Sequence, residues 1–210
     1  MSGPEVVSVE RDGAAAARST LERTVAGGGV AIFPADGLYG LCCDPLSEPA
    51  VERIQALKGR IARKPSAIMY FSPLALRELV SGMGPRVQGA VSALLPGPVT
   101  VVLPNPGRRY PLACRDDPQR LGVRLIEGPL TGTALPIFQT SANLSGEPPA
   151  ASFGELDSRL LDAVDLAIDG GELSGRPSTV IDLTRLEADG SWTIVREGAL
   201  SEEAVARALR

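Results

Sequence analysis

The sequence predicts a single α/β domain over residues 1–210, with helices flanking a twisted and mostly mixed β-sheet. Segments in which apolar residues recur at helical spacing alternate along the chain with short apolar runs, which is the pattern of an α/β fold. A chain of 210 residues can bury one sizeable core, whereas two domains would both be small. No internal repeat or long linker interrupts the alternation.

The first helix and the first strand are marked by spacing and by breakers. Residues 14–26 are predicted to be helical, because Ala17, Leu21 and Val25 recur at helical spacing and three glycines follow. Residues 30–33 form a short apolar run that we expect to be a buried strand, and residues 34–40 are expected to form a loop.

The middle of the chain repeats this alternation. Val51, Ile54 and Leu57 recur at helical spacing after Ser47, an N-cap residue type. In chain order we predict a helix over 48–57, a strand over 67–71, a helix begun by Ser72 and Pro73, a helix over 87–95, and strands over 99–103, 121–126 and 136–140.

The last third is predicted in the same way. Residues 152–161 should form a helix that begins with a capping box, in which Ser152 and Glu155 bond each other's backbone amides. Strands are expected over 164–168, 179–183 and 192–195, followed by a final helix capped by Ser201.

Composition excludes several classes of chemistry. The chain has no histidine, which excludes Ser-His-Asp and Cys-His catalysis and any zinc site built on imidazole. The net charge of -4 offers no general reason to bind nucleic acid. No apolar run approaches the ~20 residues of a membrane span, and the N-terminus lacks the features of a signal peptide. Three cysteines, of which Cys42 and Cys43 should pack as small apolar residues, suit a reducing cytoplasmic location.

Two polar segments could bind a ligand. Lys58, Arg60, Arg63 and Lys64 follow the helix over 48–57; they could bind phosphate oxygens, or they could form a solvated turn that neutralises the helix end. The segment Thr140-Ser141-Ala142-Asn143 follows an apolar strand; it could face a ligand, or it could be a turn whose side chains bond their own backbone.

Further candidates come from later strands. Ser178 precedes one strand, Arg196 ends another, and Arg124 lies within a third, where it points either to solvent or into a cleft. No GxxxxGK[ST] loop is present, and Gly27-Gly28-Gly29 precedes a strand, which is the wrong order for a dinucleotide fingerprint.

Taken in order, these pieces resemble one family, the YrdC-type L-threonylcarbamoyladenylate synthases, over about residues 28–198. The shared order and spacing carry the resemblance, more than any single motif does. The matching motifs are Pro-Ala-Asp-Gly-Leu-Tyr-Gly-Leu at 34–41, Lys-Gly-Arg at 58–60, Pro-Gly-Pro-Val-Thr at 96–100, Arg124, Ser-Ala-Asn at 141–143, Pro-Ser-Thr at 177–179 and Arg-Glu-Gly at 196–198.

The resemblance implies a large concave cleft and a nucleotidyltransferase reaction. L-threonine, bicarbonate and ATP would give threonylcarbamoyl-AMP and pyrophosphate, with Mg²⁺ carried by the ATP. The product would serve the threonylcarbamoyladenosine modification of tRNA, through weak contact with tRNA or with a downstream tRNA-modifying enzyme. Double-stranded RNA binding also belongs to this expectation, and no membrane partner does.

The resemblance also assigns residues to roles. Lys58 and Arg60 would be the catalytic cations. Together with Lys64 they would bind the ATP phosphates, while Ser141, Asn143 and Arg196 would complete the ATP site. Arg124 would pair with the threonine carboxylate and Ser178 would bond the amino acid. No residue is expected to bind a metal.

Three positions depart from the family pattern, and they concern the amino-acid pocket. Gly37 stands where the family usually has a hydroxyl, Met69 where many members have a histidine, and Pro149 where a serine is frequent. ATP is therefore better supported than threonine. Two alternatives stay open, a YciO-like paralogue that acts on another amine and a non-catalytic RNA-binding module.

Overall fold

The structure is a computed structural model that describes residues 3–59 and 65–210. The described strands are β1 (Glu5–Ser8), β2 (Ala31–Pro34), β3 (Tyr39–Cys43), β4 (Ala67–Tyr70), β5 (Val99–Pro104), β6 (Arg120–Leu125), β7 (Ile137–Ser141), β8 (Leu166–Asp169), β9 (Thr179–Asp182) and β10 (Thr193–Arg196). The described helices are α1 (Val9–Asp12), α2 (Ala14–Ala26), α3 (Glu48–Leu57), α4 (Pro73–Val80), α5 (Pro85–Leu94), α6 (Pro111–Cys114), the 3-10 turn η1 (Phe153–Glu155), α7 (Ser158–Leu161), α8 (Leu186–Asp189) and α9 (Glu202–Ala208).

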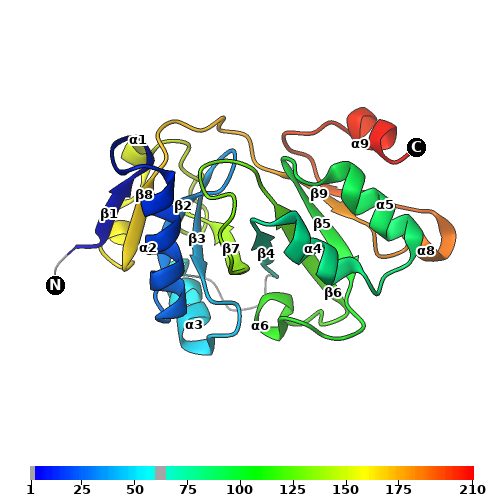
Figure 1. Ribbon diagram of the computed structural model, residues 1–210, viewed down its shortest axis with the longest axis horizontal. Coiled ribbons are helices and arrows are strands. Elements are labelled where there is room, and N and C mark those ends of the chain that lie inside the picture. The colour runs from blue at the N-terminus through cyan, green and yellow to red at the C-terminus, as the bar shows by residue number, and fades with distance from the viewer. Residues whose placement is uncertain (1–2, 60–64) are drawn as a thin grey trace.

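All ten described strands join one mixed sheet, in the order β1-β8-β2-β3-β7-β4-β6-β5-β9-β10. The pairs β1–β8, β2–β8, β4–β6 and β5–β9 are parallel, and the remaining pairs are antiparallel. The N-terminus lies near one end of this sheet and the C-terminus near the other (Figure 1). The predicted mixed sheet with flanking helices is confirmed.

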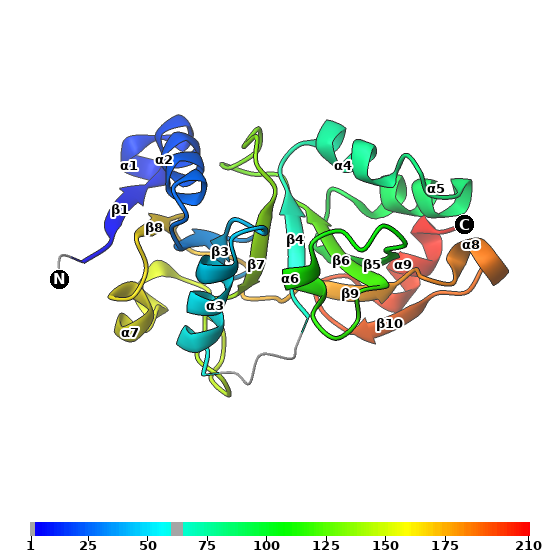
Figure 2. The same ribbon diagram turned by 90° about the horizontal axis from the view of Figure 1, so that it is seen from below.

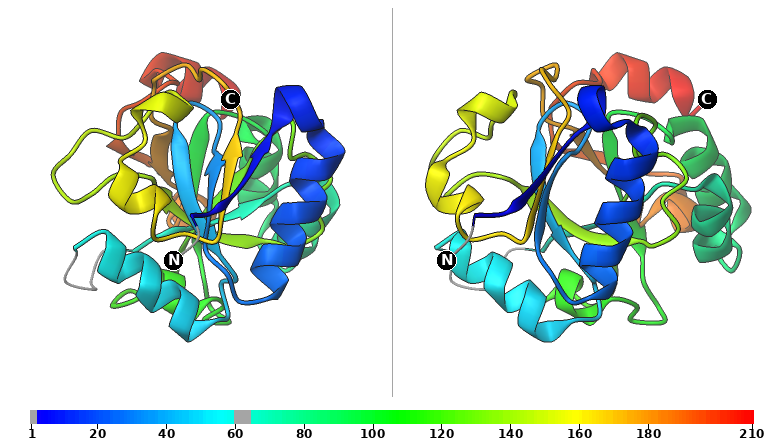
Figure 3. Two further views of the ribbon diagram at one scale, coloured as in Figure 1. Left: turned by 90° about the vertical axis from the view of Figure 1, so that its left-hand side faces the viewer. Right: turned by 60° about the vertical axis from the view of Figure 1, so that its left-hand side comes forward.

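Helices cover the two faces of the sheet unequally. Apolar residues of α2, among them Leu21 and Val25, pack with Phe33 and Met69 in one buried cluster. Helices α3, α4 and α5 pack in a second cluster, and Figure 3 shows α2 and α3 on opposite sides of the strands. Figure 2 shows α4 and α5 side by side over the end of the sheet that holds β5 and β6.

Strand β3 was missed by the sequence analysis, which placed a loop over residues 34–40. In the structure Tyr39 pairs with Pro34, so β2 and β3 form a hairpin whose loop is residues 35–38. Every residue of β3 is buried, because β3 lies inside the sheet between β2 and β7. A fully buried strand shows no polar alternation, and β3 also lacks the β-branched residues that favour strands.

The predicted helix over 152–161 is wrong as one unit. The predicted capping box of Ser152 and Glu155 is present, but it begins only the short turn η1. Leu156 and Asp157 are extended, and the Asp157 carboxylate accepts a hydrogen bond from the Arg159 amide to begin α7 as a new helix. A second cap inside the segment therefore divides it.

Other sequence predictions hold. Helices over 14–26 and 48–57 have the predicted bounds, and Ser201 caps the last helix by accepting from the Ala204 amide. Cys42, Cys43 and Cys114 are buried free thiols. Within residues 3–59 and 65–210, no helix has both the length and the apolar character needed to cross a bilayer.

Candidate functional site

A cleft of about 720 Å³ opens on the face of the sheet that carries α2, beyond the region that α2 covers. Ala67 lines the cleft, while Met69, two residues further along β4, packs in the cluster under α2. Side chains two apart on a strand share a face, so the cleft and α2 lie on the same side. The same alternation on β5 turns Thr100 and Val102 toward the cleft and Val101 into the core beneath α4 and α5.

Lys58 ties the end of α3 to the Ser141–Asn143 segment at the end of β7. Its side chain is only 1% exposed. The ammonium donates to the backbone oxygens of Ser141 and Asn143, the latter at 2.9 Å, and to Asn143 Oδ1 at 3.0 Å. The Ser141 hydroxyl lies 3.3 Å from the ammonium and donates to Asn143 Oδ1. The predicted Lys-x-Arg and Ser-x-Asn motifs thus meet through Lys58.

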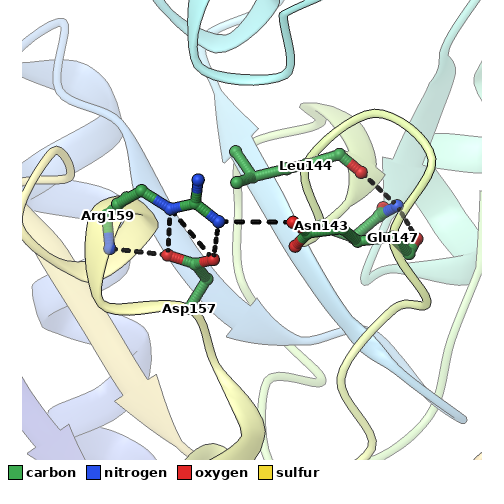
Figure 4. A network of polar contacts seen from close by, with 5 residues as sticks. All are labelled: Asn143, Leu144, Glu147, Asp157 and Arg159. Atoms are coloured by element: carbon green, nitrogen blue, oxygen red, sulfur yellow. Dashed lines mark hydrogen bonds and ion pairs between the residues drawn. The ribbon is translucent and has the colours of Figure 1, made fainter.

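The amide of Asn143 is also held by the protein. Its Nδ2 donates to the carbonyl oxygens of Leu144 at 2.9 Å and Glu147 at 2.6 Å (Figure 4). The Glu147 carboxylate in turn accepts from Arg159, which also pairs with Asp157. Asn143 therefore fixes the shape of residues 143–147, so any ligand there meets a loop that is already ordered.

Arg124 presents a buried cation to the cleft from β6. It is 5% exposed, and it donates to the Ala35 carbonyl at 3.2 Å and to Asp36 Oδ2 at 3.3 Å. Its Nε is buried and has no hydrogen-bond partner among the described residues. Burial lowers the pKa of Arg124 to about 10, against the opposing effect of Asp36 and with a further lowering by Arg196. The guanidinium is therefore charged at neutral pH and keeps a donor available.

Arg196, which ends β10, and Ser178, which precedes β9, meet at the cleft. Arg196 Nη2 donates to the Ser178 carbonyl at 2.7 Å and lies 3.1 Å from its hydroxyl. The Ser178 hydroxyl also shares a hydrogen bond of 3.0 Å with Thr100 Oγ1. Burial lowers the pKa of Arg196. Arg124, Ser178 and Arg196, predicted from three separate strands, therefore line one cleft.

Comparison with known proteins identifies the family of this chain. The Sua5/YciO/YrdC family model, described as telomere recombination, matches residues 23–198. The chain belongs to the Sua5/YciO/YrdC family. A threonylcarbamoyl-AMP synthase of Marinobacter nauticus is 32% identical over 168 residues, which cover 77% of this chain and 88% of the relative.

Two solved structures extend the comparison. P. abyssi Sua5 complexed with L-threonine has a TM-score of 0.83 at 28% identity; the match covers 99% of this chain and 61% of Sua5. This chain therefore spans less than two thirds of that protein. E. coli YciO has a TM-score of 0.80 at 25% identity, with 98% of this chain and 100% of YciO covered.

Not every predicted residue of this Sua5/YciO/YrdC chain can be placed in the cleft. Arg60 and Lys64 lie outside the described residues. Gly37 and Pro149, two of the departures from the family pattern, line the cleft. Met69 does not: it is fully buried in the cluster under α2.

Two arginines that line the cleft, Arg120 and Arg176, were not predicted from the sequence. Arg120 forms an ion pair with Asp182 and lies 3.6 Å from Asp117. Its position on β6, four residues before Arg124, puts both side chains on one face, a signal that strand periodicity could have revealed. Arg176 follows β8 in an irregular segment and donates to the Gly198 carbonyl at 3.2 Å, which no local pattern shows.

The cleft is positive in a protein that is negative overall. Among the described residues that line it, four are arginines and one, Asp117, is acidic. Clustered cations inside a partly enclosed space attract anionic groups more strongly than exposed ones do. The arrangement can therefore hold a carboxylate, a phosphate chain or both, although the whole chain carries a net charge of -4.

Proposed function

We propose that this chain makes threonylcarbamoyl-AMP and pyrophosphate from L-threonine, bicarbonate and ATP, for the threonylcarbamoyladenosine modification of tRNA in the cytoplasm. The observation that carries the proposal is the arginine-rich cleft, in which buried Arg124 keeps an unpartnered Nε among the described residues. The relative from M. nauticus is named for this product, and P. abyssi Sua5 was solved with L-threonine.

The proposed reaction needs positioning more than a strong base. The threonine amine and bicarbonate combine to a carbamate with loss of water. A carbamate oxygen then attacks the α-phosphorus of ATP, the bond from that phosphorus to the β-bridging oxygen breaks, and pyrophosphate leaves. Magnesium enters with the ATP as its counter-ion. Cations that meet the developing phosphate charge can promote such a step in a chain without histidine.

The proposal divides the cleft between two substrates. Arg124 pairs with the threonine carboxylate, and Ser178 bonds the amino acid. Ser141, Asn143 and Arg196 bind the nucleotide. Lys58 holds the loop that carries Ser141 and Asn143 in place. Arg60 and Lys64 bind the phosphates.

The test is pyrophosphate release from MgATP by the purified chain, with L-threonine and bicarbonate each added and omitted. We expect release that needs both, together with threonylcarbamoyl-AMP in the product mixture. The matched variant is Arg124→Gln, which removes the charge near the proposed carboxylate site. Absence of threonine-dependent release from a folded protein that binds ATP would refute the proposal.

A second candidate is supported by Gly37 and by the YciO structure. YciO is covered along its whole length, and Gly37 alters the amino-acid side of the cleft. The same assay with the other amino acids and with small amines separates this candidate, because a YciO-like activity would give release with a different amine. Binding of tRNA, measured at several salt concentrations, tests the RNA-binding alternative.

A further inference from the structure

Residues 170–178 form a strap that connects β8 to β9 across the sheet. Six strands lie between β8 and β9 in the sheet order, so the strap has to span the width of the cleft. In Figure 1 it runs from the yellow β8 to the orange β9 along one edge of the strands. Its last three residues, Arg176, Pro177 and Ser178, line the cleft.

The strap touches the 35–38 loop at Gly37 without room for a side chain. A Cβ atom at Gly37 would lie 2.1 Å from the Arg176 carbonyl oxygen and 2.8 Å from Ser174 Oγ. The Gly37 carbonyl also accepts a hydrogen bond of 2.9 Å from the Gly175 amide. Because the closest contact is with backbone, any larger residue at position 37 has to displace the strap itself.

The strap is also fixed on its other side and at its start. A Cβ atom at Gly198 would lie 2.4 Å from the Pro177 carbonyl oxygen, which accepts from the Ala199 amide at 2.8 Å. At the start, the buried Tyr39 hydroxyl accepts from the Gly170 amide and donates to the Gly171 carbonyl. Because the strap is held at its start and on its far side, a larger residue at position 37 has to displace residues 174–176.

The close approach at Gly37 places a main-chain hydrogen-bond acceptor beside the 35–38 loop. The Arg176 carbonyl oxygen stands where a side chain at position 37 would begin, next to the loop whose Asp36 pairs with Arg124. Within residues 3–59 and 65–210 no group donates a hydrogen bond to this oxygen. Because Arg176 and Arg124 both line the cleft, the cleft combines a main-chain acceptor with a cation, which suits a ligand that carries both a carboxylate and a donor such as an ammonium or hydroxyl group.

We propose that Gly37 is a positioning residue that seats the strap and thereby sets which amino acid the cleft accepts. The inference rests on the proposed function for the identity of the ligand, an α-amino acid bound through Arg124. Gly37 acts through the Arg176 carbonyl, on the amino-acid side of the cleft. Ser178, which accepts from Arg196 on the nucleotide side, lies beyond residues 174–176 and is also bonded to Thr100, so the nucleotide side should be affected less.

The experiment compares Gly37→Ala and Gly37→Thr with the control Gly89→Ala. Gly89 is an exposed helical glycine in α5, and a Cβ atom there meets nothing within 4 Å. For both Gly37 variants we expect the KM for the amino acid to rise about tenfold or more, with the KM for MgATP nearly unchanged. We also expect faster amide hydrogen exchange in residues 173–178, and the control should change neither property.

Two outcomes would overturn the inference. One is a Gly37→Ala variant whose amino-acid KM and strap exchange both equal those of the wild type. The other, which needs no variant to fold, is wild-type protein in which saturating amino acid leaves exchange of residues 175–178 unchanged. If the wild type uses no amino acid at all, the proposed function fails, whereas the exchange rates of Gly37→Ala still decide whether Gly37 seats the strap.

Discussion

Replacing Lys58 with methionine removes the ammonium that links α3 to the Ser141–Asn143 loop while it keeps most of the side-chain length. The backbone oxygens of Ser141 and Asn143 then lose a charged donor, whereas Asn143 Oδ1 keeps the Ser141 hydroxyl. Hydrogen bonds to charged groups contribute about 1.5–3 kcal/mol each, and removal of a buried charge recovers part of its desolvation cost. We therefore expect the free energy of unfolding to fall by about 2–4 kcal/mol, and Tm by about 4–16 °C.

Urea denaturation of Lys58→Met measures this loss, and ATP binding is measured on the same preparation. The control is Arg23→Met, which removes an exposed cation paired with exposed Glu5 and should change stability little. We expect Lys58→Met to lose both stability and ATP affinity, because the loop is no longer held. Unchanged unfolding free energy with abolished ATP binding would refute this reasoning, and would mean that Lys58 acts directly on the nucleotide.

Three further predictions follow from other contacts. Tyr39→Phe leaves the Gly170 amide and the Gly171 carbonyl without their partner, so denaturant unfolding should show a loss of about 1–3 kcal/mol. Arg124→Lys removes the planar guanidinium that reaches Ala35 and Asp36. The KM for the amino acid should rise about tenfold or more, and the KM for ATP should change little. Equal rises in the two KM values would contradict the proposed division of the cleft. Burial raises the pKa of Asp165, but hydrogen bonds from Arg53 and the Val30 amide outweigh it and leave that pKa below 3.8. Asp165 therefore stabilises the fold above pH 3.8, and this stabilisation is lost as the pH falls through the lower pKa that Asp165 has in the folded state. The Asp165→Asn variant should be less stable than the wild type near neutral pH and should approach its stability at the acid limit.

The fold could be predicted where burial and periodicity agree. The runs that became β2, β4 and β5 are apolar and short, and α2 shows a clear helical stripe. Strand β3 was missed because it lacks β-branched residues and because β7, its partner on one side, is far away in the sequence. The helix predicted over 152–161 failed because Asp157 offered a second cap, a local choice that the apolar spacing does not reveal.

The candidate site, like the fold, could be predicted from the sequence only in part. The Lys58, Ser141 and Asn143 motifs were found from the sequence, and the structure brings their side chains into contact. Bonding of the Asn143 side chain to its own loop was one of two alternatives open from the sequence, whereas the bonding of Lys58 to that loop was not predicted. Arg176 was missed because an irregular segment has no periodicity, so only its tertiary position shows that it lines the cleft. The roles of these residues in binding stay predictions.

The crossing of the strap has a consequence for how the protein acquires its site. The chain builds β2 and β3, moves to β4, β5 and β6, returns with β7 and β8, and crosses again to β9 and β10. Groups as distant in sequence as Gly37 and Arg196 therefore come together only through pairings between remote segments, which form slowly because long loops must close first. We expect the helices to be protected from hydrogen exchange early in refolding and the cleft to be completed late.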